Sequence, residues 1–90
     1  MSGIEDKIAL EIVTPAEILY TGVADSLVVS AYEGSMGVLP DHAPLVAVLK
    51  PGQVRFRSDG NNIIFNTSDG FLEIGKNKVR VIVESAEAVK

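Results

Sequence analysis

The strongest constraint on the fold is an alternation of large apolar residues with other residues near both ends of the chain. Residues 7–12 read Lys-Ile-Ala-Leu-Glu-Ile, and residues 78–84 repeat this pattern, except that Ile82 adds an apolar side chain to the second face. A period of two is typical of a β-strand with one buried face. Both ends of the chain are therefore predicted to be strands of a sheet that packs on a second sheet.

Glycine, proline, asparagine and aspartate interrupt the chain at short intervals, and Val, Ile and Phe are frequent between them. This pattern predicts strands near residues 7–14, 24–31, 36–39, 45–49, 53–58, 62–67, 70–74 and 78–84. Residues 15–20 allow either one helical turn that starts at Pro15 or an extended edge segment. Short strands with regular turns predict an all-β fold, a sandwich or a flattened barrel.

The chain of 90 residues is expected to form one domain, with a core over residues 7–84 and a tail over residues 85–90. The alternation is lost in the tail, which we interpret as frayed or as the stub of a short helix. The inner face of the predicted sandwich comprises Ile8, Leu10, Ile12, Leu72, Ile74, Val79, Val81 and Val83.

Composition narrows the classes of function. The net charge of −4 argues against nucleic acid, whose binding requires clustered cations. The absence of cysteine excludes disulfides and thiolate metal sites, and no cofactor is predicted. A hydrophobic content of 47% predicts that some apolar surface faces a partner protein. The acidic start at residues 1–7 is unlike an export signal, and no apolar run reaches the ~20 residues of a membrane-spanning helix, so a membrane connection is expected only through partners.

The densest group of special residues lies between residues 33 and 44, with two glycines, two prolines and the chain's single histidine. Such a segment is predicted to be a shaped surface loop that can dock a partner. Asp41 and His42 resemble part of a catalytic pair, but no nucleophile can be placed beside them. We interpret His42 mainly as a structural residue whose ring nitrogens bind loop groups, with a partner contact as the alternative.

The start of this segment carries candidate partner-binding residues. Glu33 is suited to a polar or basic partner surface, although exposed carboxylates are often solvated turn residues. Met36 is either a flexible contact for a partner or a plug for an irregular corner of the core. Elsewhere, residues 67–74 read as a hairpin, and the glycines nowhere have the spacing of a phosphate-binding loop, which argues against nucleotide hydrolysis.

Three blocks of sequence resemble the epsilon subunit of the proton-translocating ATP synthase. They are residues 10–15 (Leu-Glu-Ile-Val-Thr-Pro), residues 33–45 (Glu-Gly-Ser-Met-Gly-Val-Leu-Pro-Asp-His-Ala-Pro-Leu) and residues 69–74 (Asp-Gly-Phe-Leu-Glu-Ile), followed by Asn77, Val79 and Val81. The family commonly has glycine where this chain has Asp41 and often where it has Asp69, and aspartate is tolerated in turns. Most members continue into a helical hairpin, so this sequence resembles either a short member or a trimmed chain.

The resemblance implies a flattened two-sheet β-sandwich of about ten short, mostly antiparallel strands. It implies a non-catalytic rotor subunit of the central stalk, which binds the gamma subunit and the c-subunit ring and helps couple ion translocation to ATP synthesis. The expected location is peripheral, on the cytoplasmic face of the inner or plasma membrane or its organellar equivalent. Inhibition of hydrolysis and ATP sensing belong to the family's helical hairpin and are not expected here.

The resemblance also implies partner-binding residues. The family's ring-facing loop matches Glu33, Gly34, Ser35 and Met36, and the segment around His42 matches the region near the gamma contact. The main alternative is a free-standing β-sandwich module that binds peptide or carbohydrate, and such sites usually expose several aromatic residues on one face. The aromatic residues here are scattered as Tyr20, Tyr32, Phe56, Phe65 and Phe71.

Overall fold

The computed structural model describes residues 7–89, and all regular structure in this range is β-strand. Residues 1–6, which carry most of the segment compared with an export signal, lie outside the described residues, as does Lys90. The strands are β1 Ile8–Val13, β2 Ile18–Ala24, β3 Ser26–Ala31, β4 Gly34–Val38, β5 Leu45–Leu49, β6 Gly52–Ser58, β7 Asn61–Thr67, β8 Gly70–Gly75, β9 Lys78–Val83 and β10 Ala86–Ala88.

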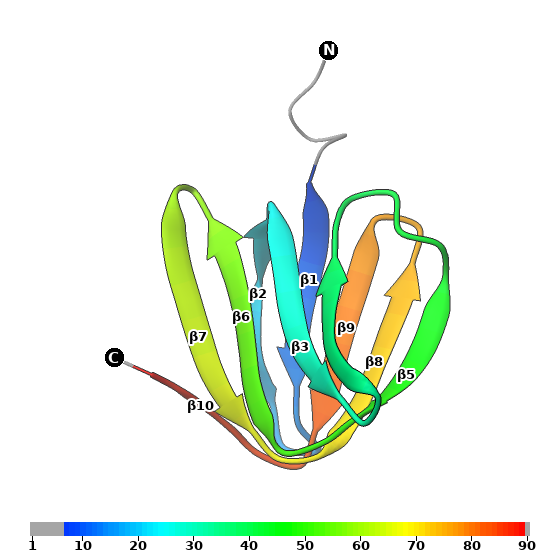
Figure 1. Cartoon of the computed structure of the whole chain (residues 1–90). Coiled ribbons are helices and arrows are strands. Elements are labelled where there is room, and N and C mark those ends of the chain that lie inside the picture. The colour runs from blue at the N-terminus through cyan, green and yellow to red at the C-terminus, as the bar shows by residue number, and fades with distance from the viewer. Residues whose placement is uncertain (1–6, 90) are drawn as a thin grey trace.

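The strands form one continuous sheet that folds over into two layers (Figure 1). Its order is β10-β7-β6-β3-β5-β8-β9-β1-β2, and β4 pairs with the other edge of β3. We call β10, β7, β6, β3 and β4 the first layer and β5, β8, β9, β1 and β2 the second layer. The pairing is antiparallel except between β1 and β9. The predicted all-β sandwich of about ten strands is therefore confirmed.

The two layers enclose one hydrophobic core because each strand turns alternate side chains inward. All eight residues predicted for the inner face are buried, and Leu72, Ile12 and Val81 are fully inaccessible to solvent. The first layer contributes the facing half of the core. Its buried apolar residues are Leu27, Val29, Ala31, Val38, Val54, Phe56 and Phe65.

Three aromatic rings close one side of the sandwich. Tyr20 from β2 lies 4.8 Å from Phe56 of β6 and 6.2 Å from Phe65 of β7, measured between ring centroids. The contact between rings of the two layers joins the edge strand β2 to the first layer. Residues that are scattered in the sequence are thus gathered inside the fold.

Three local predictions differ from the structure. Residues 18–24 form a full strand, so the extended alternative for this segment is correct and the helical turn is wrong. The interpretation of the last residues as a frayed tail or helix stub is wrong for Ala86–Ala88, which pair with β7. The strand predicted at residues 36–39 begins two residues earlier, at Gly34. In each case a paired strand supplies hydrogen bonds that the local pattern does not reveal: β1 for residues 18–24, β7 for residues 86–88 and β3 for Gly34.

Gly70 lies where β8 passes very close to β9. A Cβ atom at this position would approach the carbonyl oxygen of Ile82 to 2.0 Å and a methyl group of Val83 to 2.8 Å. Both neighbours belong to a paired strand, and the carbonyl is backbone, so neither can move away without disrupting the sheet. Only glycine fits this position.

We expect Gly70→Ala to lower the free energy of unfolding by about 2 to 4 kcal/mol, because the added methyl group overpacks the β8–β9 pair. Gly37→Ala is the matched control, since a Cβ atom there would have no neighbour within 4 Å and the φ of Gly37 is not positive. Urea unfolding followed by circular dichroism measures both variants. Equal stability of the two variants would contradict this account of Gly70.

Candidate docking surfaces

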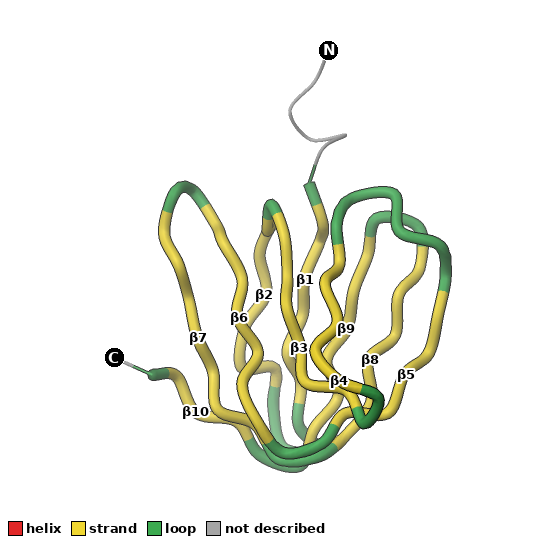
Figure 2. Tube along the Cα trace, in the orientation of Figure 1, coloured by secondary structure: helices red, strands yellow, loops and turns green. Residues whose placement is uncertain are grey.

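The segment 33–44, predicted to be one shaped loop, is divided by strand β4. Gly34–Val38 pair along β3, so only the turn at Tyr32 and Glu33 and the loop over residues 39–44 remain outside strands. A strand of five residues spans roughly 17 Å. The β3–β4 turn and the β4–β5 loop consequently lie at opposite ends of the sandwich, where the connecting loops gather (Figure 2). Glu33 belongs to the turn and His42 to the loop. The prediction that residues 33–44 form a single loop is wrong, and their role in docking stays a prediction.

The end that carries Glu33 is acidic. Strand pairing brings to this end the turns between β1 and β2, between β3 and β4 and between β7 and β8, and the segment after β9. Their exposed charged residues include Glu17, Glu33, Asp69 and Glu84, with Lys50 beside them. We call this the acidic end. Its excess of carboxylates favours contact with a basic surface.

The other predicted residues of the Glu33 segment have different surroundings. Gly34 has a φ of 124°, which favours glycine. Ser35 is exposed opposite Ser30, whereas Met36 is half-buried and packs against the core, as its interpretation as a plug requires. Met36 also lines, with Glu33, a cavity of about 410 Å³ beside β5. Whether these residues bind a partner stays a prediction.

The loop at the opposite end is held by hydrogen bonds. The His42 backbone N–H donates to the Leu39 carbonyl at 3.2 Å, and its ring Nδ1 lies 2.8 Å from the Ala43 carbonyl. This contact matches the structural interpretation of His42. Asp41, at a φ of 68°, donates its backbone N–H to the Asn77 side-chain oxygen at 2.9 Å. Asn77 thus connects this loop to the β8–β9 turn.

Positive φ values occur in the backbone at both ends of the sandwich. Gly34, Asp41 and Asn77 all have positive φ values, and each lies in or beside a loop at a strand end. Asp41 takes this conformation although aspartate accepts it less readily than glycine, and the hydrogen bond from its N–H to Asn77 stabilises it. Hydrogen bonds that hold a loop before a partner arrives lower the entropy lost on binding.

An apolar row crosses the outer face of the second layer. In register, Val48 of β5 pairs with Phe71 of β8, Phe71 with Ile82 of β9, Ile82 with Val13 of β1, and Val13 with Ile18 of β2. We call these five residues the apolar row. Side chains paired across strands point to the same side of a sheet. Ile18, Val48 and Phe71 are each at least half exposed.

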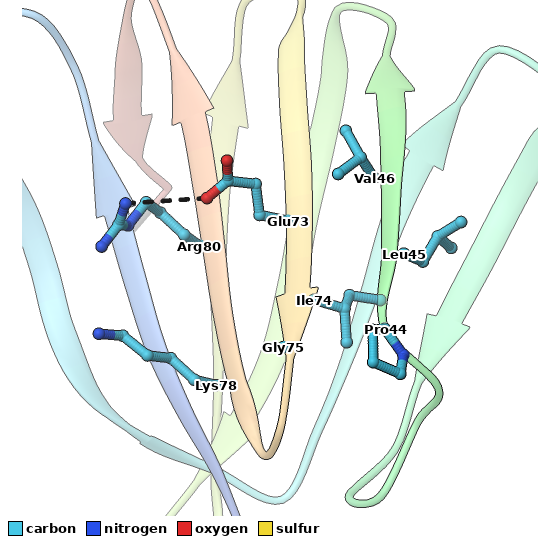
Figure 3. Close-up of a pocket in the computed structure, with 8 residues that line it drawn as sticks. All are labelled: Pro44, Leu45, Val46, Glu73, Ile74, Gly75, Lys78 and Arg80. Carbon is cyan, nitrogen blue, oxygen red and sulfur yellow. Dashed lines mark ion pairs between the residues drawn. The ribbon is translucent and has the colours of Figure 1, made fainter.

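A charged row runs beside the apolar row. Arg80 of β9 pairs with Glu73 of β8 at 3.7 Å and with Glu11 of β1 at 3.3 Å. Val46, 66% exposed, ends this row on β5. Between Val46 and Lys78 the face is hollowed into a depression of about 570 Å³, in which Arg80 and Glu73 face each other (Figure 3). The outer face thus combines apolar area with fixed charges.

Sequence reasoning does not identify this face as a candidate site. The alternation places Phe71 on the side opposite the core, but residues 45–49 are uniformly apolar, so their pattern carries no sign of which side is inward. Only the pairing of Val48 with Phe71 reveals a continuous surface. One sequence feature does indicate this face: Ile82 is an apolar residue at an outward position, where the alternation of its strand would place a polar one.

The described residues 7–89 include no group of three or more histidine, aspartate and glutamate side chains that could hold a metal ion. Within the same range there is no helix long and apolar enough to cross a membrane.

The molecule is a β-sandwich domain with an acidic end, a hydrogen-bonded loop at the other end and an apolar row on one face, a combination that is typical of domains that dock other proteins. Residues 7–89 match the family described as "ATP synthase, Delta/Epsilon chain, beta-sandwich domain". The chain therefore belongs to this family. It is 42% identical over 82 residues to the ATP synthase epsilon chain of Carboxydothermus hydrogenoformans and 35% identical over 82 residues to that of Brevibacillus brevis.

The matches cover 91% and 90% of this chain but 61% and 62% of those two relatives, so the chain spans about three-fifths of their length. Solved structures share the fold. A chain in the Euglena gracilis mitochondrial ATP synthase superposes with a TM-score of 0.88 at 23% identity, covering 97% of this chain and 56% of that one. A chain in the Tetrahymena thermophila mitochondrial ATP synthase, from a structure of its central stalk and c-ring, gives 0.74 at 18% identity, covering 91% and 66%.

We expect Asn77→Gly to release the loop over residues 39–44 while leaving the sheet intact. Glycine accepts the φ of 52° at this position, so the substitution removes the side-chain acceptor of the Asp41 N–H without straining the backbone. Amide exchange at Asp41 should accelerate by roughly fivefold, the effect of one hydrogen bond of about 1 kcal/mol. Asp59→Gly, at a φ of 51°, is the control. Unchanged exchange at Asp41 would show that the loop is held by other contacts.

Proposed function

We propose that this chain is a non-catalytic rotor subunit of the central stalk of an ATP synthase, which binds the gamma subunit and the c-subunit ring and helps couple ion translocation to ATP synthesis. Family membership supports the complex, and the surfaces support a role in docking. In this proposal the chain lies peripherally, on the cytoplasmic face of the inner or plasma membrane or its organellar equivalent, and reaches the membrane only through its partners.

The observation that carries the proposal is the apolar row. A single exposed apolar residue is ordinary, but five in register across neighbouring strands form a continuous patch that water solvates poorly. The adjacent charged row, from Glu11 through Arg80 to Glu73, supplies fixed polar partners at the rim. This combination of an apolar centre and a polar rim is typical of protein–protein interfaces. We assign this face to gamma, because the family resemblance implies that gamma contacts one side of the sandwich and the c ring its end.

The acidic end is the second contact in this proposal. The exposed Glu33 lies at its tip, beside a turn whose shape depends on Gly34. Polar and basic loops of a c ring complement this charge, and such complementarity orients a partner more than it adds affinity. With gamma on one face and the ring at one end, the domain transmits torque between two partners that turn together.

The alternative function as a carbohydrate-binding or peptide-binding module has less support. Carbohydrate sites of this kind need several exposed rings on one face. Tyr20, Phe56 and Phe65 instead pack together, and the exposed Tyr32 and Phe71 come from different layers of the fold.

We expect Phe71→Asp to weaken binding to the gamma subunit by about 30-fold, because a charge replaces an apolar residue at the centre of the proposed interface. Phe71 is half exposed, so the fold should survive. The measurement is the dissociation constant from purified gamma by calorimetry or interferometry. Val89→Asp is the matched control, since Val89 is exposed beyond β10 at the edge of the first layer. Equal binding by the folded variant and the wild-type chain would remove the apolar row from the interface.

We expect Glu33→Lys to leave stability within about 0.5 kcal/mol of wild type and to lower the number of protons pumped per ATP hydrolysed in reconstituted membranes. The reason is repulsion between the new ammonium group and basic loops of the ring. Salt should narrow the difference, because exposed charges are screened beyond ~8 Å at physiological ionic strength. Glu87→Lys, on β10, is the control. If coupling at low salt is unchanged in the folded, gamma-bound variant, Glu33 is a solvated turn residue.

A further inference from the structure

The outer face of the first layer differs in charge from the rest of the molecule. The outward positions of β3, β6 and β7 contain two arginines, Arg55 and Arg57, and no carboxylate, although the whole chain has 12 acidic and 8 basic residues. The exposed carboxylate of this layer, Glu87, lies on the edge strand β10, opposite Asn66. The remaining outward residues of these strands are neutral. They are Ser26, Val28, Ser30, Gln53, Asn62, Ile64 and Asn66.

Neither guanidinium of Arg55 and Arg57 has an ion-pair or hydrogen-bond partner among residues 7–89. The third arginine of the chain, Arg80, has two carboxylate partners. Both unpaired arginines are exposed and line the same shallow cavity of about 440 Å³. Guanidinium groups without internal partners retain all their donors for a ligand.

The neighbours of the two arginines form two short rows across the strands. Arg57 lies between Ser26 of β3 and Asn62 of β7, which add a hydroxyl and a carboxamide. Arg55 lies between Val28 and Ile64, both half-buried, which provide an apolar floor. Charged donors, neutral donors and apolar contact are therefore combined at one place.

We propose that this arginine face binds an acidic, extended segment of another protein, with carboxylates two residues apart that each accept from one guanidinium. Arg55 and Arg57 are two residues apart on one strand, so their Cα atoms are separated by roughly 7 Å, which equals the spacing of alternate side chains in an extended peptide. Planar guanidinium groups hold carboxylates by paired hydrogen bonds. The face lies in the first layer, whereas the apolar row lies in the second, so this binding is independent of the gamma contact proposed above.

The spacing favours an extended acidic peptide over other anions. A single phosphate contacts both guanidinium groups only if the two groups converge on one point. Side chains that extend in parallel from one strand reach two separate carboxylates without converging. Nucleic acid needs many more phosphate contacts than two arginines supply, and the net charge of −4 repels it. The proposed occupant is thus defined by its spacing as well as by its charge.

The test uses the 90-residue chain and two synthetic octapeptides with the same composition. In the alternating peptide glutamate alternates with serine, and in the blocked peptide, Glu-Glu-Ser-Ser-Glu-Glu-Ser-Ser, no two glutamates are two residues apart. Binding is followed at low salt through the backbone amide and arginine side-chain resonances in nuclear magnetic resonance titrations. We expect the alternating peptide to bind about fivefold more tightly than the blocked peptide and to shift the Arg55 and Arg57 side-chain signals.

The double variant Arg55→Gln with Arg57→Gln should weaken binding of the alternating peptide by at least about tenfold. The matched control, Lys50→Gln with Lys76→Gln, removes the same charge elsewhere and should change binding by less than about twofold. Equal losses in the two double variants would overturn the proposal, because long-range attraction alone would explain binding. Equal affinity for both peptides, or competition by inorganic phosphate at the same concentration as the peptide, would also overturn it in favour of a simple anion site.

Discussion

Strand β3 holds the two layers of the fold together. Its first half pairs with β6 in the first layer, and its last residue, Ala31, pairs with Leu49 of β5 in the second layer. The chain passes from β5 to β6 with the Lys50 N–H still donating to the Ser30 carbonyl at 3.0 Å. The backbone therefore changes layers without losing its pairing, and the inner faces of the two layers meet over one core.

This arrangement assigns different tasks to the two sides of each strand. Inward side chains are constrained by close packing, as the fully buried Leu72 illustrates, so almost any change there alters stability. Outward side chains have little effect on folding and are free to serve binding. The apolar row of the second layer and the arginine face of the first layer use this freedom in chemically opposite ways. Under the two proposals made above, partners of different character would occupy opposite faces of one small domain without competing.

The candidate site could be predicted only in part from sequence. The segment 33–44 correctly indicates where special backbone geometry occurs, and the partly buried Met36 and hydrogen-bonded His42 match the structural interpretations of these residues. The division of this segment by β4 is not visible, because short glycine-containing strands resemble loops in composition. Val48 and Phe71 are far apart in the chain, and nothing local relates them until β5 pairs with β8.

The sequence by itself determined the fold class and the inner faces of β1, β8 and β9. Their period-two patterns are local, and burial of one face is enough to decide which side chains turn inward. The tertiary structure alone decided that Ile18–Ala24 and Ala86–Ala88 are strands, that Glu33 and His42 lie at opposite ends, and that the apolar row is continuous. The physical reason is that strands obtain their hydrogen bonds and lateral neighbours from other strands, some of them distant in the chain. Register, and with it every surface that spans several strands, therefore exists only after the sheet has formed.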